Sequence, residues 1–337
     1  MGLIIGVDEA GYGPNLGPLV ISATVWNVPG DPGEFDLWNA LRRVISNRLP
    51  RAGRPQSASG RPNGPASATA VRKRAAKLHV ADSKQVYSPA RGIGPLESSV
   101  LSLLGSQAAF ATLSDLWMHL CGVAPGTDCP ERWFAGDGLA LPLPLCADER
   151  EIATFADRLQ SQFDDSQVQL RRVASDIVLT ERFNSQTHEM GSKGAVLSRA
   201  TLELVRRVWN PDHDGPALVI ADKHGGRSRY QGLLADVFDV IPMCLDEGLQ
   251  RSRYRLGQSE VRFEARAERH LPVAVASMVS KYVRELSMEV FNRFWRRHLP
   301  DLVPTKGYPT DARRFRAEIA HVQTELGIPD AVLWRNR

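Results

Sequence analysis

Nine residues near the beginning of the sequence say most about the fold: Gly6-Val7-Asp8-Glu9-Ala10-Gly11-Tyr12-Gly13-Pro14. The apolar run Leu3–Val7, which leads into the two acids, has the length and composition of a buried strand. The glycines and the proline that follow the acids are typical of a turn. A second run, Gly17–Val28, is rich in Val, Ile and Thr and predicts another strand. We therefore expect the two acids at the end of a strand, beside a glycine-rich turn.

The rest of the sequence mixes strand and helix patterns. Strands are predicted at Gln167–Val178, Ala217–Ala221 and Val261–Ala265, with a further possible strand at Ala108–Leu113. Helices are predicted from the N-cap residue Asp36 to about Ile45, and over Pro89–Leu104, Asp148–Phe163, Lys193–Val208 and Pro272–His298. There are no internal repeats. This mixture predicts an α/β fold with one main domain, residues 1–337.

Composition sets limits on the class of protein. Of 337 residues, 43% are hydrophobic and 24% are charged, which is the balance of a soluble globular protein. The apolar runs are shorter than the roughly 18 residues of a spanning helix, and none resembles a signal peptide, so we expect a cytoplasmic protein. The four cysteines, at positions 121, 129, 146 and 244, include no CxxC pair. We interpret them as reduced thiols, and a disulfide or metal among the first three stays open.

The net charge of +4 is unevenly distributed. Between Leu37 and Ala81 there are ten basic residues and no acidic one, so the rest of the chain has six more acids than bases. Segment 48–77 has the Pro, Gly, Ser and Arg content of a basic, disordered insertion, and segment 106–165 is a further insertion whose structure the pattern does not indicate. The basic segment either binds a polyanion such as nucleic acid or is a solvated insertion whose charge is incidental.

Four acids form a candidate metal site. Asp8 and Glu9 end the first strand, Asp222 ends another buried strand, and Glu285 lies on the flank of the apolar stripe of the long helix. Carboxylates at strand ends can share one crevice, and Mg²⁺ or Mn²⁺ would relieve their repulsion. Two such ions about 3.5–4 Å apart can support phosphodiester cleavage. The alternatives are that the Asp-Glu pair only solvates a turn and that Glu285 only pairs with Lys281.

Five blocks of the sequence resemble the motifs of ribonuclease HII, in that family's order. The first block is Gly6–Pro14 together with Gly17-Pro18-Leu19-Val20, and it resembles GVDEAGRGP…GPVV. The others are Asp82-Ser83-Lys84, which resembles DSK; the apolar run that ends at Asp222; Val275–Glu285, which resembles AASIxAKxxRD; and Lys306-Gly307-Tyr308-Pro309-Thr310, which matches KGYPT. The blocks span residues 6 to 310 and cover about a quarter of the chain closely.

This resemblance implies a ribonuclease-H-like mixed sheet flanked by helices, and an endonuclease that hydrolyses the RNA strand of RNA–DNA hybrids with two Mg²⁺ or Mn²⁺ ions. It maps the catalytic and metal-binding acids onto Asp8, Glu9, Asp222 and Glu285. We expect a monomer that binds nucleic acid and no membrane. The residues expected to bind substrate are Gly11, Tyr12, Gly13, Lys84, Lys281, Lys306 and Tyr308. Taken singly, each lysine is also explained as a surface charge, and Tyr308 as a buried aromatic at a helix entry.

The sequence departs from the family pattern at three places. Tyr12 replaces the arginine of the turn, Glu285 stands where the family has Asp, and Lys-His-Gly-Gly follows Asp222. His224 in that stretch is either a proton carrier or a solvated turn residue. Three other functions therefore stay open beside a ribonuclease for RNA–DNA hybrids. They are a non-catalytic nucleic-acid-binding protein, a nuclease with another substrate, and a nucleotide hydrolase. The last is disfavoured because the sequence contains no G-x-x-x-x-G-K-[ST] loop.

Overall fold

The computed structural model describes residues 1–48, 76–88 and 90–336. Within these residues the main element is a seven-stranded sheet in the order β5-β2-β1-β6-β9-β8-β7. Its strands are β1 (Gly2–Ala10), β2 (Leu19–Val28), β5 (Gln169–Val178), β6 (Ala217–Asp222), β7 (Met243–Glu247), β8 (Arg251–Leu256) and β9 (Ser259–Glu264). The pairs β1–β6 and β6–β9 are parallel and the others antiparallel. A short pair, β3 (Ile45–Ser46) and β4 (Leu78–His79), lies apart.

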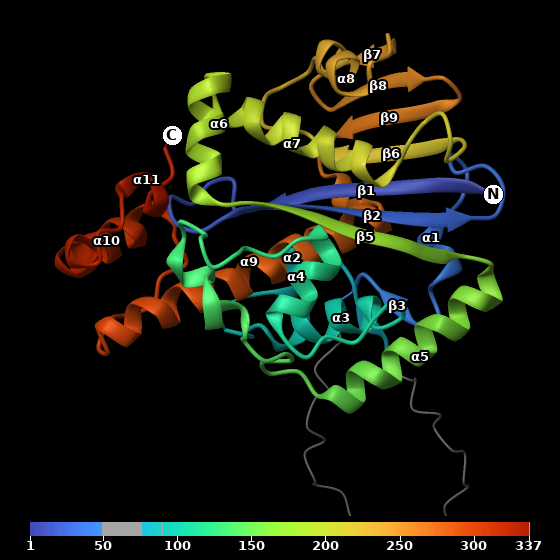
Figure 1. Cartoon of the computed structure of the whole chain (residues 1–337). Coiled ribbons are helices and arrows are strands. Elements are labelled where there is room, and N and C mark those ends of the chain that lie inside the picture. The colour runs from blue at the N-terminus through green and yellow to red at the C-terminus, as the bar shows by residue number, and fades with distance from the viewer. Residues whose placement is uncertain (49–75, 89, 337) are drawn as a thin grey trace, which may run out of the picture.

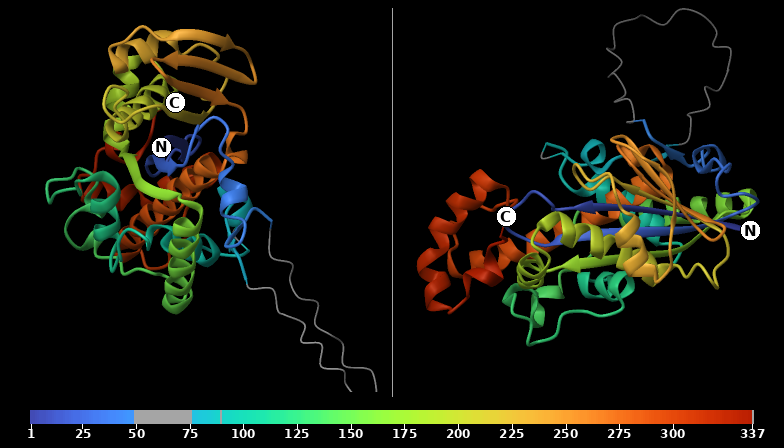
Figure 2. Two further views of the ribbon diagram at one scale, coloured as in Figure 1. Left: turned by 90° about the vertical axis from the view of Figure 1, so that its right-hand side faces the viewer. Right: turned by 90° about the horizontal axis from the view of Figure 1, so that it is seen from above.

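Helices cover both faces of this sheet (Figure 1). On one face lie α6 (Thr180–Met190), α7 (Lys193–Val208) and α8 (Gln231–Phe238). On the other lie α3 (Gly94–Leu104), α4 (Leu113–Cys121), α5 (Glu149–Ser166) and the long α9 (Leu271–His298). Figure 2 shows α10 (Pro309–Glu325) and α11 (Asp330–Leu333) at the end of the molecule opposite the N-terminus. The mixed sheet with helices on both faces confirms the predicted α/β fold class.

Alternation along β1 explains the two-sided core. Leu3, Ile5 and Val7 pack into the cluster on the α7 side, whereas Ile4 packs into the cluster on the α9 side. Successive side chains of a strand point to opposite faces, so one apolar run supplies both clusters. Gly6 faces α9, and a Cβ there would collide with the backbone of Pro272. The absence of a side chain at this position lets the start of α9 approach the strand closely.

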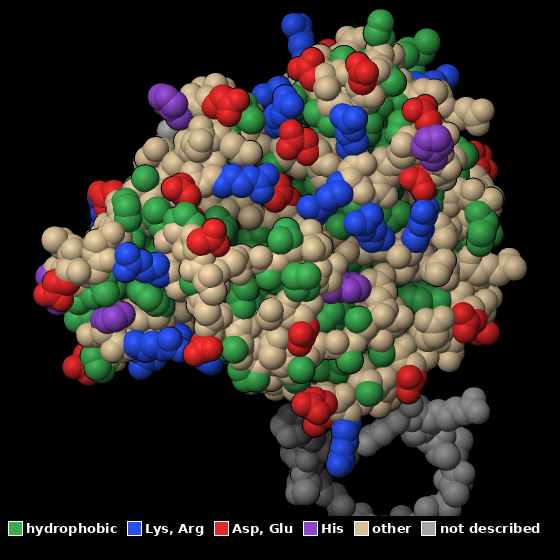
Figure 3. Space-filling model, viewed as in Figure 1, with side chains coloured by type: hydrophobic (Ala, Val, Ile, Leu, Met, Phe, Trp, Pro, Cys, Tyr) green, Lys and Arg blue, Asp and Glu red, His purple; other side chains and the backbone are tan. Residues whose placement is uncertain are grey.

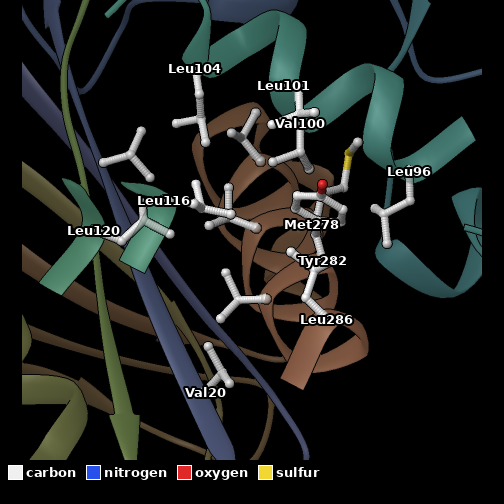
Figure 4. Packing of buried hydrophobic residues seen from close by; sticks show 14 of the residues in the cluster. Val20, Leu96, Val100, Leu101, Leu104, Leu116, Leu120, Met278, Tyr282 and Leu286 are labelled. Atoms are coloured by element: carbon white, nitrogen blue, oxygen red, sulfur yellow. The ribbon is translucent and has the colours of Figure 1, made fainter. Parts of the chain in front are cut away.

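The segment 106–165 adds to the same core. It contains α4, the short helices η1 (Arg132–Phe134) and η2 (Gly136–Leu139), and most of α5. Figure 4 shows Leu116 and Leu120 of α4 packed with side chains of α3 and with Met278, Tyr282 and Leu286 of α9. Thr112 and Asp115 form a capping box that begins α4, so the predicted strand Ala108–Leu113 is wrong: its residues lead into a helix.

Other boundaries agree with the sequence pattern or shift for local reasons. The predicted helix Lys193–Val208 is confirmed as α7, and Pro272–His298 as α9, which begins one residue earlier. Asp36 does cap a helix, its side chain accepting from the Asn39 amide, but α1 (Leu37–Ala40) ends well before Ile45. Ile45 instead pairs with Leu78 in the short parallel ladder. The helix predicted from Pro89 begins only at Gly94, and Pro89 itself lies outside the described residues.

Two further predictions can be compared with the structure, and a third cannot. All four cysteines are free thiols, and Cys121 and Cys129 are half-buried. No helix in the described ranges is both long and apolar enough to cross a membrane. The predicted disordered insertion at 48–77 falls almost wholly on residues 49–75, which lie outside the described part of the chain.

Candidate functional site

Three of the predicted acids lie close together where two central strands of the sheet end. Asp8 and Glu9 lie near the end of β1, and Asp222 is the last residue of β6. These two strands are parallel neighbours, with Val7 opposite Ala221. The acids that follow these residues therefore lie at the same end of the two strands. The Asp8 side chain is buried, and Glu9 and Asp222 are half-buried.

Helix α9 supports the end of β1 through serine side chains. The Ser280 hydroxyl donates to the carbonyl oxygen of Asp8 over 3.0 Å and contacts the hydroxyl of Ser22 at 2.8 Å. One turn earlier, the Ser277 hydroxyl donates to the Ser83 hydroxyl over 3.1 Å. Ser277 also lies close enough to the Asp8 carboxyl to lower its pKa, against the larger effect of burial. The motif Val275–Glu285 therefore places small polar groups, rather than bulky apolar ones, against the acids.

A fourth acid, Glu268, joins the group, and the sequence analysis did not identify it. It lies in the short helix η3 (Ala267–Arg269), between β9 and α9. Because β9 runs parallel to β6 with Glu264 opposite Asp222, the chain leaves β9 at the edge where Asp222 lies. The Asp222 Oδ1 accepts a hydrogen bond from the Ala267 amide over 3.1 Å. The available signal was an acid in the turn between a predicted strand and the long helix.

Crowding of these carboxylates is visible in their pKa values. Burial, and next the charge of Glu9, raise the pKa of Asp8 well above its usual range. Burial, and next the charge of Asp222, raise the pKa of Glu9 to about 7. The pKa values of Asp222 and Glu268 are also raised, mainly by burial, and the Asp222 charge adds to the effect on Glu268. The charges of these four acids therefore act on one another, and a nearby cation would stabilise their ionised form.

Lys84 is a cation close to this group. It lies on α2 (Ser83–Val86), whose N-cap Asp82 accepts from the Lys84 amide over 3.0 Å. Burial lowers the pKa of Lys84, but Asp82, Glu268, Asp8 and Asp222 together raise it above its usual value. An open cleft of about 530 Å³ adjoins the group. The residues that line it are Trp38, Asn47, Ala81, Asp82, Lys84, Gln85, Asp222, Arg266, Glu268 and Arg269.

Glu285 belongs to a different cluster. Its Oε1 accepts from Lys281 Nζ over 2.7 Å, and its Oε2 accepts from Lys306 Nζ over 2.5 Å. Burial raises the pKa of Glu285, but these two lysines outweigh burial and lower it overall. The structure thus groups Asp8, Glu9 and Asp222 with Glu268, whereas both oxygens of Glu285 are held by ammonium groups. The expected pairing of Glu285 with Lys281 is present, and its assignment as a metal ligand has no support from this arrangement.

The expected substrate-binding residues lie around both clusters. Lys281 and Lys306 also face the ring of Tyr87, with Nζ atoms 4.6 and 5.8 Å from its centroid. In the turn, Gly11 has φ +93°, and a Cβ there would lie 2.5 Å from the Pro18 carbonyl oxygen, so the position needs glycine. The Tyr12 ring lies 4.7 Å from Lys193 Nζ.

Tyr308 and His224 resolve two of the open alternatives. Tyr308 stands at the N-cap of α10 with 52% of its surface exposed, so it is not a buried aromatic at a helix entry. His224 is buried against α7, with its Nδ1 3.0 Å from the Ser198 hydroxyl. Burial, and next the charge of Arg227, lower the pKa of His224 to about 3. His224 is therefore a neutral core residue, and both a proton carrier and a solvated turn residue are wrong descriptions of it.

The donor chemistry of the acid group suits a hard divalent cation. Its side chains offer only carboxylate oxygens, which Mg²⁺ and Mn²⁺ prefer. Burial, and next the neighbouring acids, raise the pKa values of Asp8 and Glu9, and a bound cation would oppose this effect. Across residues 1–48, 76–88 and 90–336, however, no three His, Cys, Asp or Glu side chains converge closely enough to hold one ion by themselves. The ligand type of these four acids suits a divalent cation. Their side chains lie further apart than the ligands of a closed coordination shell.

Comparison with known proteins gives matches among solved structures only. No family model and no curated sequence matches this chain. The chain is similar to Archaeoglobus fulgidus RNase HII, solved in complex with PCNA, at 14% identity over 99% of this chain and 94% of that one, with a TM-score of 0.40. It is also similar to ribonuclease H2 from Pyrococcus horikoshii OT3, at 15% identity over 98% and 92%, with a TM-score of 0.42. A third match is Bst-RNase HIII in complex with Mn²⁺, at 14% identity over 99% and 65%, with a TM-score of 0.40.

Proposed function

We propose that this protein is a metal-dependent endonuclease that hydrolyses the RNA strand of RNA–DNA hybrids. The observation that carries the proposal is the group of Asp8, Glu9, Asp222 and Glu268, whose charges raise one another's pKa values, together with the open cleft that Asp222 and Glu268 line. Buried acids that repel one another are costly to fold unless a cation neutralises them. The ordered motifs that resemble ribonuclease HII point to the same reaction class.

In this proposal, Asp8, Glu9, Asp222 and Glu268 hold Mg²⁺ or Mn²⁺. The bound ions would supply a nucleophilic water at neutral pH and charge stabilisation for the leaving oxygen. Ser277 and Ser280 keep the end of β1 and its acids in register with α9. Lys84 balances the acid group from the side of the cleft and is placed to contact a phosphate that enters it.

Substrate contacts are assigned to the turn and to the basic cluster. The turn Gly11–Gly13 has little side-chain bulk, so its backbone can approach a sugar closely, and the 2′-hydroxyl is the group that distinguishes RNA from DNA. Lys281 and Lys306 carry two positive charges against the single negative charge of Glu285, which favours phosphate binding at this cluster. Exposed Tyr308 can stack on a sugar or donate to a phosphate.

Cleavage of three labelled duplexes tests the proposal: a full hybrid, a DNA duplex with one ribonucleotide, and all-DNA, each with Mg²⁺ and with Mn²⁺. We expect cleavage of the full hybrid, weaker cleavage at the single ribonucleotide because Tyr12 replaces a cationic residue of the turn, and none of all-DNA. Asp8→Asn should abolish cleavage, and Asp236→Asn, on the exposed side of α8, should not. Undiminished turnover by Asp8→Asn would contradict the proposal.

The second candidate is a nucleic-acid-binding protein that keeps this fold without cleaving its ligand. It is favoured by the wide spread of the acids among the described residues and by the lysines that occupy Glu285. The same experiment separates the two functions. Tight binding of the hybrid in a gel-shift assay, with no product in either metal, would support the binding protein and exclude the nuclease.

A further inference from the structure

The last described residues of the chain return to the turn beside the acid group. Arg335 is only 2% exposed although it is the third residue from the end of the sequence. Its Nη1 donates to the carbonyl oxygen of Gly11 over 2.5 Å and to that of Gly17 over 3.4 Å. Its Nη2 donates to the carbonyl oxygen of Tyr12 over 3.2 Å. One side chain thus holds three carbonyl groups of the loop between β1 and β2.

Arg335 is itself held in place from two sides. Its guanidinium carbon lies 4.0 Å from the centroid of the Phe183 ring on α6. The neighbouring Asn184 donates to the carbonyl oxygens of Ala331 and Trp334 and accepts from the Asn336 amide, at 2.7–2.8 Å. The Arg335 amide also donates to the carbonyl oxygen of Asn15 over 2.9 Å. These contacts hold the Arg335 side chain in one position against the Gly11–Gly13 turn.

The orientation of these carbonyl groups determines where the turn's amides point. In a trans peptide the C=O of one residue and the N–H of the next point in opposite directions. Because Arg335 binds the carbonyl oxygens of Gly11 and Tyr12, the amides of Tyr12 and Gly13 point away from it. Neither amide donates a hydrogen bond within the described part of the chain, and Gly13 is exposed with no atom within 4 Å of a Cβ placed on it. Two adjacent free donors of this kind suit an anionic or hydroxyl ligand.

We propose that Arg335 is a positioning residue for substrate binding: it holds the Gly11–Gly13 turn so that the amides of Tyr12 and Gly13 face the sugar–phosphate backbone of the nucleic acid. The inference rests on the proposed function and adds a determinant that lies more than 300 residues from the turn in the sequence. Arg335 touches neither the acids nor the cleft, so it acts through the turn alone.

A second buried arginine also contacts this loop. Arg284 of α9 donates to the carbonyl oxygen of Leu16 over 3.3 Å and to that of Lys306 over 3.0 Å. Burial, and next the charge of Arg284, lower the pKa of Arg335 to about 9, so Arg335 remains cationic at neutral pH. Two buried like charges destabilise the fold unless hydrogen bonds to nearby groups compensate for their lost hydration. Here both are bonded to carbonyl groups of the loops that flank the proposed substrate path.

The test measures affinity and kinetics for Arg335→Met and Arg335→Lys. The dissociation constant for a full hybrid is measured in EDTA, where no cleavage occurs, and KM and kcat are measured with Mn²⁺. Loss of two neutral hydrogen bonds to the ligand corresponds to about a tenfold weaker affinity. We expect Arg335→Met to raise the dissociation constant and KM by about that factor with kcat changed less than about threefold, and Arg335→Lys, which keeps a cation and a donor, to recover part of the loss.

Controls separate the possible outcomes. Arg316→Met removes an exposed arginine that pairs with Asp330 and stacks 4.9 Å from the Trp334 ring, in the same C-terminal region, and should leave affinity unchanged. Equal affinity of Arg335→Met and the parent overturns the inference, and so does a parallel loss of kcat and folding stability with KM unchanged. Should Arg335→Met not fold, Arg335→Lys alone decides by the same KM and affinity criteria. If the parent protein neither binds the hybrid in EDTA nor cleaves it with Mn²⁺, the proposed function fails before the variants are compared.

Discussion

Among single residues, the most informative difference lies between two glutamates. Glu268 is coupled to Asp8, Glu9 and Asp222, whereas Glu285 is neutralised by Lys281 and Lys306. Both acids are near α9 in sequence, one before it begins and one at its middle. A carboxylate that is already bonded to two ammonium groups gains less from a metal ion than one surrounded by other acids.

Paired amide substitutions test this assignment. Glu268→Gln should lower the cleavage rate by orders of magnitude, because it removes a proposed ligand, and should leave metal-free stability equal or higher, because it relieves repulsion. Glu285→Gln should reduce stability by about 1–3 kcal/mol, because it leaves two lysines partly buried without a counter-charge. Hydrolysis with Mn²⁺ and urea denaturation in EDTA measure both effects. A larger loss of activity in Glu285→Gln than in Glu268→Gln would instead support Glu285 as the metal ligand.

Between secondary-structure elements, one buried carboxylate joins segment 106–165 to the core. Glu97 of α3 is fully buried, and it accepts from the amides of Leu145, Cys146 and Ala147 at 2.7–2.8 Å. It also accepts from the Tyr282 hydroxyl of α9 over 2.7 Å. These bonds fix the loop that leads into α5 between α3 and α9.

Glu97→Gln should therefore destabilise the fold by about 2–4 kcal/mol, because the new amide nitrogen would face at least one backbone amide, which can only donate. Tyr282→Phe removes one of the four donors and should cost about 0.5–1.5 kcal/mol. Urea denaturation followed by tryptophan fluorescence measures both. A cost below about 0.5 kcal/mol for Glu97→Gln would show that the loop is held by its apolar contacts instead.

An ion-pair cluster on the paired strands β8 and β9 gives a pH-dependent prediction. Arg253 lies opposite Arg262, an unfavourable pairing of like charges, and Glu260 accepts from both at 2.6 and 2.7 Å. Burial raises the pKa of Glu260, but the two guanidinium groups outweigh it and lower the pKa to about 2. An acid whose folded pKa is depressed stabilises the protein above its unfolded pKa, and this contribution is lost as pH falls from about 4.5 towards 2.

Glu260→Gln should cost about 1–2 kcal/mol at pH 7, discounted because the carboxylate is partly solvated, and the cost should shrink below pH 4. Denaturation midpoints at pH 7, 4 and 3 for the variant and the parent test this. Glu203→Gln, which breaks the exposed pair with Arg199, is the matched control and should cost at most about 0.5 kcal/mol at any pH. A pH-independent cost at Glu260 would argue against the ion-pair explanation.

Across the whole molecule, positive charge is concentrated in one stretch of the sequence. Figure 3 shows a face on which Lys and Arg side chains alternate with Asp and Glu, so this face is not uniformly basic. The stretch between Leu37 and Ala81 carries ten of the 42 basic residues and no acid. A long-range attraction for nucleic acid is therefore expected to depend on this stretch more than on the face in Figure 3.

Replacing Arg51, Arg54 and Arg61 with Gln tests that dependence. The slope of log affinity for a hybrid against log salt should become shallower by up to about 0.9 for each phosphate that these arginines neutralise in the parent. A control with Gln at Ser57, Ser59 and Ser67 keeps the charge and should retain the parent slope. Identical slopes for all three proteins would mean that the stretch does not contribute to binding.

Local sequence patterns were sufficient to predict the strands of the sheet centre, the helices α7 and α9, and the positions of Asp8, Glu9 and Asp222 at strand ends. These features follow from periodicity, which a strand or helix imposes on its own residues. The same reasoning failed at Ala108–Leu113, where the capping box of Thr112 and Asp115 outweighed an apolar run.

Which distant groups meet could be seen only in the folded chain. Glu268 joins the acids because β9 is the parallel neighbour of β6, and strand order is not encoded in local spacing. Glu285 is neutralised in part because Lys306 returns from beyond the end of α9 to bind it. Arg335 reaches Gly11 across 324 positions because the C-terminal segment packs on α6. Such contacts depend on the path of the whole chain, since the free energy that selects them comes from burying apolar faces far apart in sequence.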